Sequence, residues 1–414
     1  MTDQARLTTR EAAARLGVKP ETVYAYVSRG QLSSERAPGG RGSTFDPREV
    51  DALARRGARR EPAAPAPGGE LSFRTAITLI DQDRYYFRGV DAVELAGAYG
   101  FEEVAEWVWT GELTREPRFT APRPFLDAAR HAVAALPAHS GAMDRLRVAA
   151  VAVSAADPLR FDLDPPAVLG CGRTLIPTLV GALPTVGGGG RGEAPSEGRL
   201  ARQLWQRLTP EVPDESSIRL LDMALALLID HDLAASTLAA RVAASARAHP
   251  YAVVSAGLGA LEGPLHGAAS GLAHRTLAEV LERGGAAPVV ADHLRSGRRV
   301  PGLGHRLYPR EDPRAQALFA LLGAIPQAAD ALAAARDVVE TTARHTALYA
   351  NVDLALAVMS VAFGMPAEAG ETVFAVARTA GWIAHALEEY AERPLRMRPS
   401  GHYTGPRPPR PLPG

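Results

Sequence analysis

The sequence predicts an all-α protein in two parts, a small helical domain joined by a linker to a larger helical body. Apolar residues recur at helical spacing along most of the 414 residues, and few stretches show the sustained alternation of a large sheet. Residues 1–60 hold twelve Lys/Arg and seven Asp/Glu, a net charge of +5, although the whole chain balances 46 basic against 46 acidic residues. Residues 61–70 are rich in Pro, Ala and Gly, which is typical of a linker.

The composition excludes several kinds of chemistry. Lys19 is the only lysine, so the body has neither a Walker phosphate loop nor a lysine for a Schiff base. Cys171 is the only cysteine and no histidine pair has helical metal-site spacing, so we expect no disulfide and no metal. The N-terminus lacks the layout of a signal peptide and no apolar run is long enough for a membrane span, so we expect a soluble cytoplasmic protein.

Residues 1–60 are expected to form three short helices with a hairpin before the third. The helices should cover about 9–16, 20–28 and a segment that starts near 47, and the Gly-rich stretch 37–42 suits the tip of a hairpin, or wing. Each helix has a start signal, in order Thr8 or Thr9, Pro20, and Asp46-Pro47 with Glu49.

The segment LTTREAAARLGVKPETVYAYVSRGQL resembles the winged helix-turn-helix of the MerR and excisionase families. In that module the second helix enters the major groove of DNA. The resemblance therefore implies that bases or phosphates are contacted by Lys19, Glu21, Thr22, Tyr24 and Ala25, and the DNA backbone by Arg29 and Arg41. The alternative is a small helical module that makes protein contacts, with its arginines solvated.

The body begins near Leu71 and is expected to be mostly helical. Residues 101–109 have the spacing of an amphipathic helix. Residues 143–156 and 220–229 are apolar on nearly all sides, so both are expected to be buried helices.

Four side chains of the body stand out as candidates for chemistry. His266 in GPLHG and His305 in PGLGHR have neighbouring glycines that leave backbone amides open and let a ligand approach closely. His231 follows a buried run, where a polar group needs a partner or a function. Asp353 precedes an apolar helix, and burial would make it a better base near neutral pH. Each residue alone also fits a bland explanation, a core histidine or a helix cap.

Taken together, these segments resemble the citrate synthase family. GALEGPLHGAASG, VPGLGHRLYPREDPRAQAL, NVDLALAVMSVAFGMP and FAVARTAGWIAHALEEY occur in the order and approximate spacing of that family, as do LLIDHDLAASTLAARV and the N- and C-terminal signatures. The resemblance spans about 71–405, with 406–414 left as a tail. It implies the all-helical citrate synthase fold, in which a small domain at about 268–364 closes on a larger one.

The resemblance also implies an activity, the condensation of acetyl-CoA with oxaloacetate and hydrolysis of citryl-CoA, an acyltransferase of the EC 2.3.3 class. Asp353 matches the base that removes the methyl proton, and His266 the donor to the resulting enol oxygen. His305 matches the group that polarises and protonates the oxaloacetate carbonyl, and His231 an additional donor. No cofactor is implied beyond the acyl-CoA co-substrate.

The carboxylates of the substrate and the phosphates of CoA are expected to be bound by cationic side chains. The resemblance indicates which residues these are. Planar guanidinium groups suit carboxylates, and the matching residues are Arg314, Arg378 and Arg398. The family supplies the last of these from the partner subunit, so a homodimer with shared sites is implied. The residues expected to bind CoA are Val300, Gly302, Gly304, Arg306 and Arg310.

The chain departs from the family after His266, where Ala268 to Gly271 replace the usual Gly-Ala-Asn-Glu. The loss of the amide and the carboxylate is expected to loosen the helix that follows. Two alternatives to a citrate synthase remain. One is a 2-methylcitrate synthase that uses propionyl-CoA. The other, of a different class, is a DNA-binding regulator whose body senses oxaloacetate, citrate or an acyl-CoA.

Overall fold

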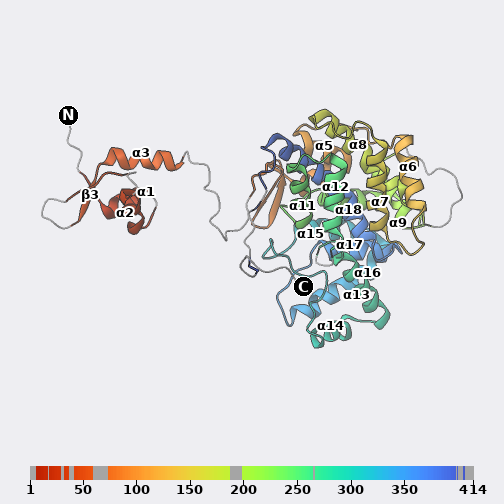
Figure 1. Ribbon diagram of the computed structural model, residues 1–414. Helices are drawn as coiled ribbons and strands as arrows, with labels where there is room; N and C mark the ends of the chain where they lie inside the picture. The colour runs from red at the N-terminus through yellow and green to blue at the C-terminus, as the bar shows by residue number, and fades with distance from the viewer. Residues whose placement is uncertain are drawn as a thin grey trace, which may run out of the picture. The chain divides into compact units, whose positions relative to one another are not determined.

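A computed structural model of the chain describes residues 6–16, 18–28, 32–36, 42–58, 73–186, 198–263, 266–397, 399 and 404–405. The chain divides into two compact units, Met1–Arg74 and Thr75–Gly414 (Figure 1). Each unit has its own cluster of buried apolar side chains, so each can be described by itself.

The N-terminal unit has the three predicted helices and a small antiparallel sheet in the order β1-β3-β2. Thr8 begins the first helix, because its backbone N–H donates to Glu11 Oε2 (2.8 Å) while its hydroxyl accepts from the Glu11 N–H (3.4 Å). The strands on either side of the predicted hairpin tip pair as expected, and the short strand before the first helix is an addition that the sequence did not predict. The elements are β1 (Leu7–Thr8), α1 (Thr9–Leu16), α2 (Pro20–Ser28), β2 (Glu35–Arg36), β3 (Ser43–Phe45) and α3 (Pro47–Ala58).

The second unit starts with a small antiparallel sheet of β4 (Thr78–Asp81), β5 (Arg84–Phe87) and β6 (Val90–Asp91), in that order. The rest of its described part is helical, as predicted. The helices are α4 (Ala92–Ala98), α5 (Phe101–Thr110), α6 (Arg123–Ala134), α7 (Ala142–Ala156), α8 (Pro165–Ala182), α9 (Leu200–Leu208), α10 (Glu215–Leu228), α11 (Ala235–Ser245), α12 (Pro250–Leu261), α13 (Ala269–Arg283), α14 (Ala286–Arg295), α15 (Pro313–Leu322), the 3₁₀ turn η1 (Pro326–Ala328), α16 (Ala329–Ala343), α17 (Val352–Ala362) and α18 (Ala369–Ala391).

Helix α18 is the centre of this unit. It packs against α5, α8, α10, α11 and α12, and most of its 23 residues are buried (Figure 1). At one end of the unit α13, α14 and α16 pack together, all within the segment 268–364 (Figure 1). Helix α17 lies between these two regions, since it contacts both α13 and α18.

The two helices expected to be buried differ. The segment 220–229, which covers most of α10, is buried on all sides, as predicted. Helix α7 buries only one face, and on its other face Val151 is 61% exposed. This outer face lines an open cavity of about 710 Å³ together with Ala132 of α6, residues 136, 139 and 140 after α6, and Ser255. The expectation for α7 is therefore wrong for the described chain, because no described element covers its apolar outer face.

No single helix in the described ranges is both long and apolar enough to cross a membrane. Helix α15 and the segment Pro326–Ala343 meet the length and composition criteria only as a pair, and they are bent by 115° at the break between them.

Candidate active site

Backbone pairing brings the segment of His305 against the start of α17. Gly302 and Gly304 both have φ +79°, and a Cβ on Gly302 would lie 2.8 Å from the Cβ of Leu354, so glycine is required there. The Gly304 N–H donates to the Tyr349 carbonyl (2.7 Å), and the Asn351 N–H donates to the Gly302 carbonyl (3.0 Å). The Asn351 side chain adds a bond to the Gly304 carbonyl (2.9 Å). These hydrogen bonds join residues 302–304 to residues 349–351, so they hold the backbone next to His305 and the backbone next to Asp353 together.

Asp353 lies in the first turn of α17, where its carboxylate is not needed as a cap. Asn351 is the N-cap, and its Oδ1 accepts from the backbone N–H groups of Asp353 (3.0 Å) and Leu354 (3.4 Å). Burial raises the pKa of Asp353 to about 6, against the opposing effect of Arg314. The side chain therefore has the basicity of a general base that works near neutral pH.

His305 and His231 lie close together, with ring centroids 5.2 Å apart. His231 Nε2 is 2.6 Å from the hydroxyl of Tyr308. His305 Nδ1 accepts the Leu307 N–H (3.1 Å), and Arg314 Nη2 lies 3.3 Å from His305 Nε2. Burial lowers the pKa of His305 to about 4 and the pKa of His231 well below its usual value. Both imidazoles are therefore neutral at physiological pH and able to donate one hydrogen bond.

His266 is the third imidazole of the site, and Ser236 orients it. Its Nε2 is 2.8 Å from Ser236 Oγ, and its ring meets Phe374 of α18 edge-on at 6.0 Å. Burial, aided by the charge of Arg378, lowers the pKa of His266 to about 4. This ring is neutral as well.

Two of the arginines predicted to bind substrate carboxylates, Arg314 and Arg378, are described, and both are buried with different partners. Arg314 makes a bidentate pair with Asp312, Nε to Oδ1 at 3.0 Å and Nη2 to Oδ2 at 2.8 Å. Arg378 donates from Nε to the Leu228 carbonyl (3.0 Å) and lies 4.5 Å over the ring of Phe374. Its Nη2 is buried and has no hydrogen-bond partner among the described residues. Burial lowers the pKa of Arg378 to about 10, so it stays charged at neutral pH.

The charge of Arg378 lowers the pKa of His231 and of His266, so it acts on both sides of the site. The charge of Arg314 acts on His305 and on Asp353. The structure thus gathers His231, His266, His305, Asp353 and the two arginines around one region of α17 and α18. Buried cations next to neutral donors and one basic carboxylate suit a substrate that carries carboxylates and a polarisable carbonyl.

The predicted CoA-binding residues outside the paired segment 302–304 differ in exposure. The side chain of Val300 lies in the core, so only its backbone can face a ligand. Arg306 and Arg310 are exposed, and Arg310 Nε lies 3.7 Å from a carboxylate oxygen of Asp83. Arg398 lies outside the described residues.

Sequence reasoning did not assign Ser236, Tyr308 or Asp312, which contact His266, His231 and Arg314. A signal for the first was present, since Ser236 follows His231 by five residues in the LLIDHDLAAST segment.

The altered segment after His266 is closely packed, in place of the expected loosening. Ser270 is buried against α18, where a Cβ on Gly370 would lie 2.7 Å from its hydroxyl oxygen. A Cβ on Gly271 would lie 3.2 Å from the Ala367 carbonyl oxygen. Small residues at 270 and 271 therefore let the start of α13 approach the start of α18.

In the N-terminal unit the structure exposes two of the residues predicted to face DNA. Lys19 is exposed just before α2, and Tyr24 on α2 is 52% exposed. Thr22 is half-buried. Arg29, Arg41 and the side chains of Glu21 and Ala25 lie outside what the structure describes. Within the described ranges no group of three or more His, Cys, Asp or Glu side chains is placed to hold a metal ion.

Comparison with known proteins gives each unit a family. Residues 6–58 match the model of a helix-turn-helix domain, and residues 68–400 match the model of the citrate synthase C-terminal domain. The citrate synthase of Synechocystis sp. is 31% identical over 77% of this chain and 84% of that protein. The 2-methylcitrate synthase 2 of Corynebacterium glutamicum is 27% identical over 81% of this chain and 93% of that protein. The crystal structure of citrate synthase from Thermotoga maritima is 27% identical, covers 82% of this chain and 95% of its own, and superposes with a TM-score of 0.65. The chain therefore belongs to the citrate synthase family of enzymes.

Proposed function

We propose that this protein is a citrate synthase that condenses acetyl-CoA with oxaloacetate and hydrolyses citryl-CoA to citrate and CoA. The family uses no cofactor beyond its acyl-CoA substrate. The observation that carries the proposal is the buried Arg378, whose Nη2 has no partner among the described residues and which lies among neutral imidazoles. A buried guanidinium with a spare donor is suited to a substrate carboxylate.

In the first step the Asp353 carboxylate removes a proton from the methyl group of acetyl-CoA. That carbon acid is weak, so the enol oxygen needs a hydrogen bond where the charge develops. His266 supplies it, because a Ser236 hydroxyl that donates to Nε2 leaves the proton of the neutral ring on Nδ1.

In the second step the enol carbon attacks the oxaloacetate carbonyl and a carbon–carbon bond forms. The imidazole N–H of His305 donates to the carbonyl oxygen and gives up its proton as the alkoxide develops. His231, oriented by Tyr308, binds the same substrate. Water then cleaves the thioester of citryl-CoA, which releases citrate and the free thiol of CoA.

The substrate carboxylates are bound by Arg378, Arg314 and an arginine from the partner subunit, for which Arg398 is the candidate. The exposed apolar face of α7 supports a homodimer, since a second copy would cover Val151 and the adjoining cavity. CoA lies along the backbone of Val300, Gly302 and Gly304, with its phosphates near two exposed arginines, Arg306 and Arg310.

Residues 71–405 form the catalytic part, between a linker at 61–70 and a tail at 406–414. Helices α13 to α17, within about 268–364, form the small domain that closes over the substrates and brings His305 and Asp353 to His266. We place the protein in the cytoplasm.

The test of the proposed function is thiol release by the purified full-length chain given oxaloacetate and either acetyl-CoA or propionyl-CoA. Faster release with acetyl-CoA supports the proposal. Faster release with propionyl-CoA favours a 2-methylcitrate synthase, the alternative that the similarity to the Corynebacterium enzyme supports. No release with either donor from a folded protein contradicts both.

Asp353→Asn should lower the rate of thiol release by at least about a thousandfold, because the amide cannot accept the methyl proton. The variant keeps the shape of the side chain and the Asn351 cap, so its affinity for oxaloacetate, measured by calorimetry, should stay within about threefold of the native value. A variant that keeps a tenth of the native rate would show that Asp353 is not the base.

A function of another class is supported by the exposed Lys19 and Tyr24 on a domain that matches a helix-turn-helix model. A dimeric body would carry two such domains and suit an operator with two-fold symmetry. Binding of genomic fragments at low salt, altered by oxaloacetate, citrate or acetyl-CoA, would support a metabolite-sensing regulator. No binding with or without these ligands would contradict it.

A further inference from the structure

One face of α18 binds the three residues that precede His231. The Arg378 Nε donates to the Leu228 carbonyl, and a Cβ on Gly381 would lie only 2.0 Å from the Ile229 carbonyl oxygen. One turn further on, His385 Nε2 lies 3.2 Å from Asp230 Oδ1. Positions 378, 381 and 385 share a helix face. Each of the three residues from Leu228 to Asp230, at the end of α10 and just before His231, therefore contacts α18.

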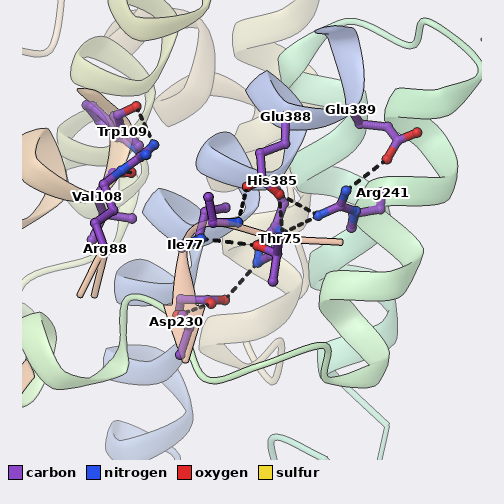
Figure 2. Close-up of polar contacts among 12 residues, drawn as sticks. Thr75, Ile77, Arg88, Val108, Trp109, Asp230, Arg241, His385, Glu388 and Glu389 are labelled. Carbon is purple, nitrogen blue, oxygen red and sulfur yellow. Dashed lines mark hydrogen bonds and ion pairs between the residues drawn. The ribbon is translucent and has the colours of Figure 1, made fainter. Parts of the chain in front are cut away.

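Asp230 is fully buried, and both of its carboxylate oxygens are bonded. Oδ2 accepts a hydrogen bond from the Thr78 hydroxyl on β4 (2.5 Å). Oδ1 faces His385, as Figure 2 shows. Burial alone would raise the pKa of Asp230, but His385, Arg378 and Thr78 together hold it below its usual value. An ionised carboxylate in the core requires these donors, because an unpaired buried charge is strongly unfavourable.

Arg241 of α11 determines which nitrogen of His385 carries the proton. Its Nη1 lies 2.9 Å from His385 Nδ1, and a guanidinium can only donate, so Nδ1 accepts. The proton of the neutral ring is then on Nε2, directed at Asp230. Arg241 is itself bonded to Glu388 (2.7 Å) and Glu389 (3.2 Å), as Figure 2 shows. The tautomer of His385 is thus fixed by neighbours on two helices.

We propose that His385 is a positioning residue for the oxaloacetate site, acting through Asp230 to hold the backbone from which His231 projects. We call Thr78, Asp230, His385 and Arg241 the Asp230 clamp. None of these four side chains needs to touch substrate. This inference rests on the proposed function, since His231 is taken as a ligand of oxaloacetate. It predicts that weakening the clamp impairs oxaloacetate recognition more than recognition of the acyl donor.

Thr78→Val is the mildest test, because it removes the hydroxyl donor while it keeps nearly the same side-chain shape. It should raise KM for oxaloacetate about tenfold and leave KM for acetyl-CoA within about twofold, since a hydrogen bond to a charged group is lost. Thr78→Ser restores a hydroxyl and should return KM for oxaloacetate to near the native value.

Thr209→Val is the matched control for general loss of stability. The Thr209 hydroxyl, like that of Thr78, donates one hydrogen bond within the second unit: it is buried and donates to the Phe363 carbonyl (2.8 Å), outside the clamp. Thr78→Val and Thr209→Val should lower Tm by similar amounts, but only the first should change KM for oxaloacetate.

A second pair of variants tests the histidine. His385→Phe removes the donor to Asp230 and the acceptor of Arg241, whereas His385→Gln keeps an amide donor and a carbonyl acceptor. Glutamine should recover most of the oxaloacetate affinity that phenylalanine loses. If His385→Phe does not fold, the comparison of His385→Gln, Thr78→Val and Thr209→Val still decides the question.

Oxaloacetate binding measured by calorimetry separates this inference from the proposed function. Weaker binding by Thr78→Val, with native binding by Thr209→Val, supports the clamp even if the native protein releases no thiol, and in that case only the proposed function fails. The clamp is overturned if Thr78→Val and Thr209→Val have the same effect on oxaloacetate binding, or if Thr78→Val changes both KM values equally.

Discussion

Asp353 and the three site histidines have pKa values displaced in opposite directions by one cause, burial. Removal from water disfavours the charged form of any group, so the carboxyl of Asp353 holds its proton more tightly while the imidazoles lose theirs more easily. At pH 7 this leaves most of Asp353 ionised and the imidazoles neutral. These are the protonation states that a base and hydrogen-bond donors require for the proposed reaction.

The pKa of Asp353, about 6, predicts the pH dependence of the reaction. The active form of the base is deprotonated, so kcat/KM for acetyl-CoA should fall about tenfold for each pH unit below 6 and level off above 7. The histidine pKa values near 4 lie below this range and should not add to the slope at pH 5–6. Thiol release between pH 5 and 8 at saturating oxaloacetate measures this profile. A rate that stays constant from pH 7 to 5 would exclude Asp353 as the titrating base.

Sequence reasoning named most residues of the candidate site but not the residues that orient them. His231, His266, His305 and Asp353 lie in segments whose composition is unusual when they are considered locally. Ser236 and His385 could not be assigned in this way, because their partners His266 and Asp230 lie 30 and 155 positions away in the chain. Such pairs are defined only once the helices have packed.

At the level of elements, the contact between α10 and α18 depends on the absence of a side chain at Gly381. Gly381→Ala would place a methyl group against the Ile229 carbonyl, so α10 or α18 must shift. We expect a loss of about 1–3 kcal/mol in the free energy of unfolding, as for other overpacked cores. Denaturant titration measures it. An unchanged stability would mean that the two helices are not in contact here.

Gly259→Ala is the control for that measurement. Gly259 lies in α12, and a Cβ there would meet nothing within 4 Å. Alanine is the better helix former, so this variant should be more stable than the native protein by about 0.5–1 kcal/mol. Opposite signs for two Gly→Ala changes in the same body would show that packing, and not helix propensity, governs position 381.

Helix boundaries were predictable where a cap or a proline marks them, as at Thr8, Pro20 and Pro47. Strands β4 and β5 were missed because each has only four residues. All four residues of β4 and two of β5 remain partly or fully exposed, so the alternation of buried and exposed residues is too short to detect. The exposed face of α7 was missed for another reason. An apolar pattern predicts that a face will be covered but does not say whether the same chain covers it.

At the level of the whole molecule, the chain consists of two units with separate cores. In the part of the N-terminal unit that the structure describes, the buried apolar core consists of Ala12, Ala13, Val23, Leu32, Phe45 and Val50. The second core includes none of these and extends from Ile77 to Ala386. The sequence places a linker at 61–70 from charge and composition, because these properties are local and need no knowledge of packing.

Separate cores predict separate activities. A chain that begins at residue 67 should release thiol within about twofold of the full-length rate and unfold at nearly the same temperature, because the second core is left complete. Parallel kinetic assays and calorimetry of the two proteins test this. A large loss of activity would show that the N-terminal unit contributes to catalysis.

Helix α18 is at once the centre of the core and the source of Arg378 and His385. A mutation in this helix is therefore expected to alter both stability and oxaloacetate recognition. Few substitutions in the sequence of α18 should then be tolerated. In the proposed function the acyl donor meets other elements, the start of α17 and the segment around Gly302 and Gly304 that is hydrogen-bonded to it. We expect natural drift and laboratory selection to change the acyl donor more readily than the keto acid, and a library in α18 to yield mostly unfolded proteins.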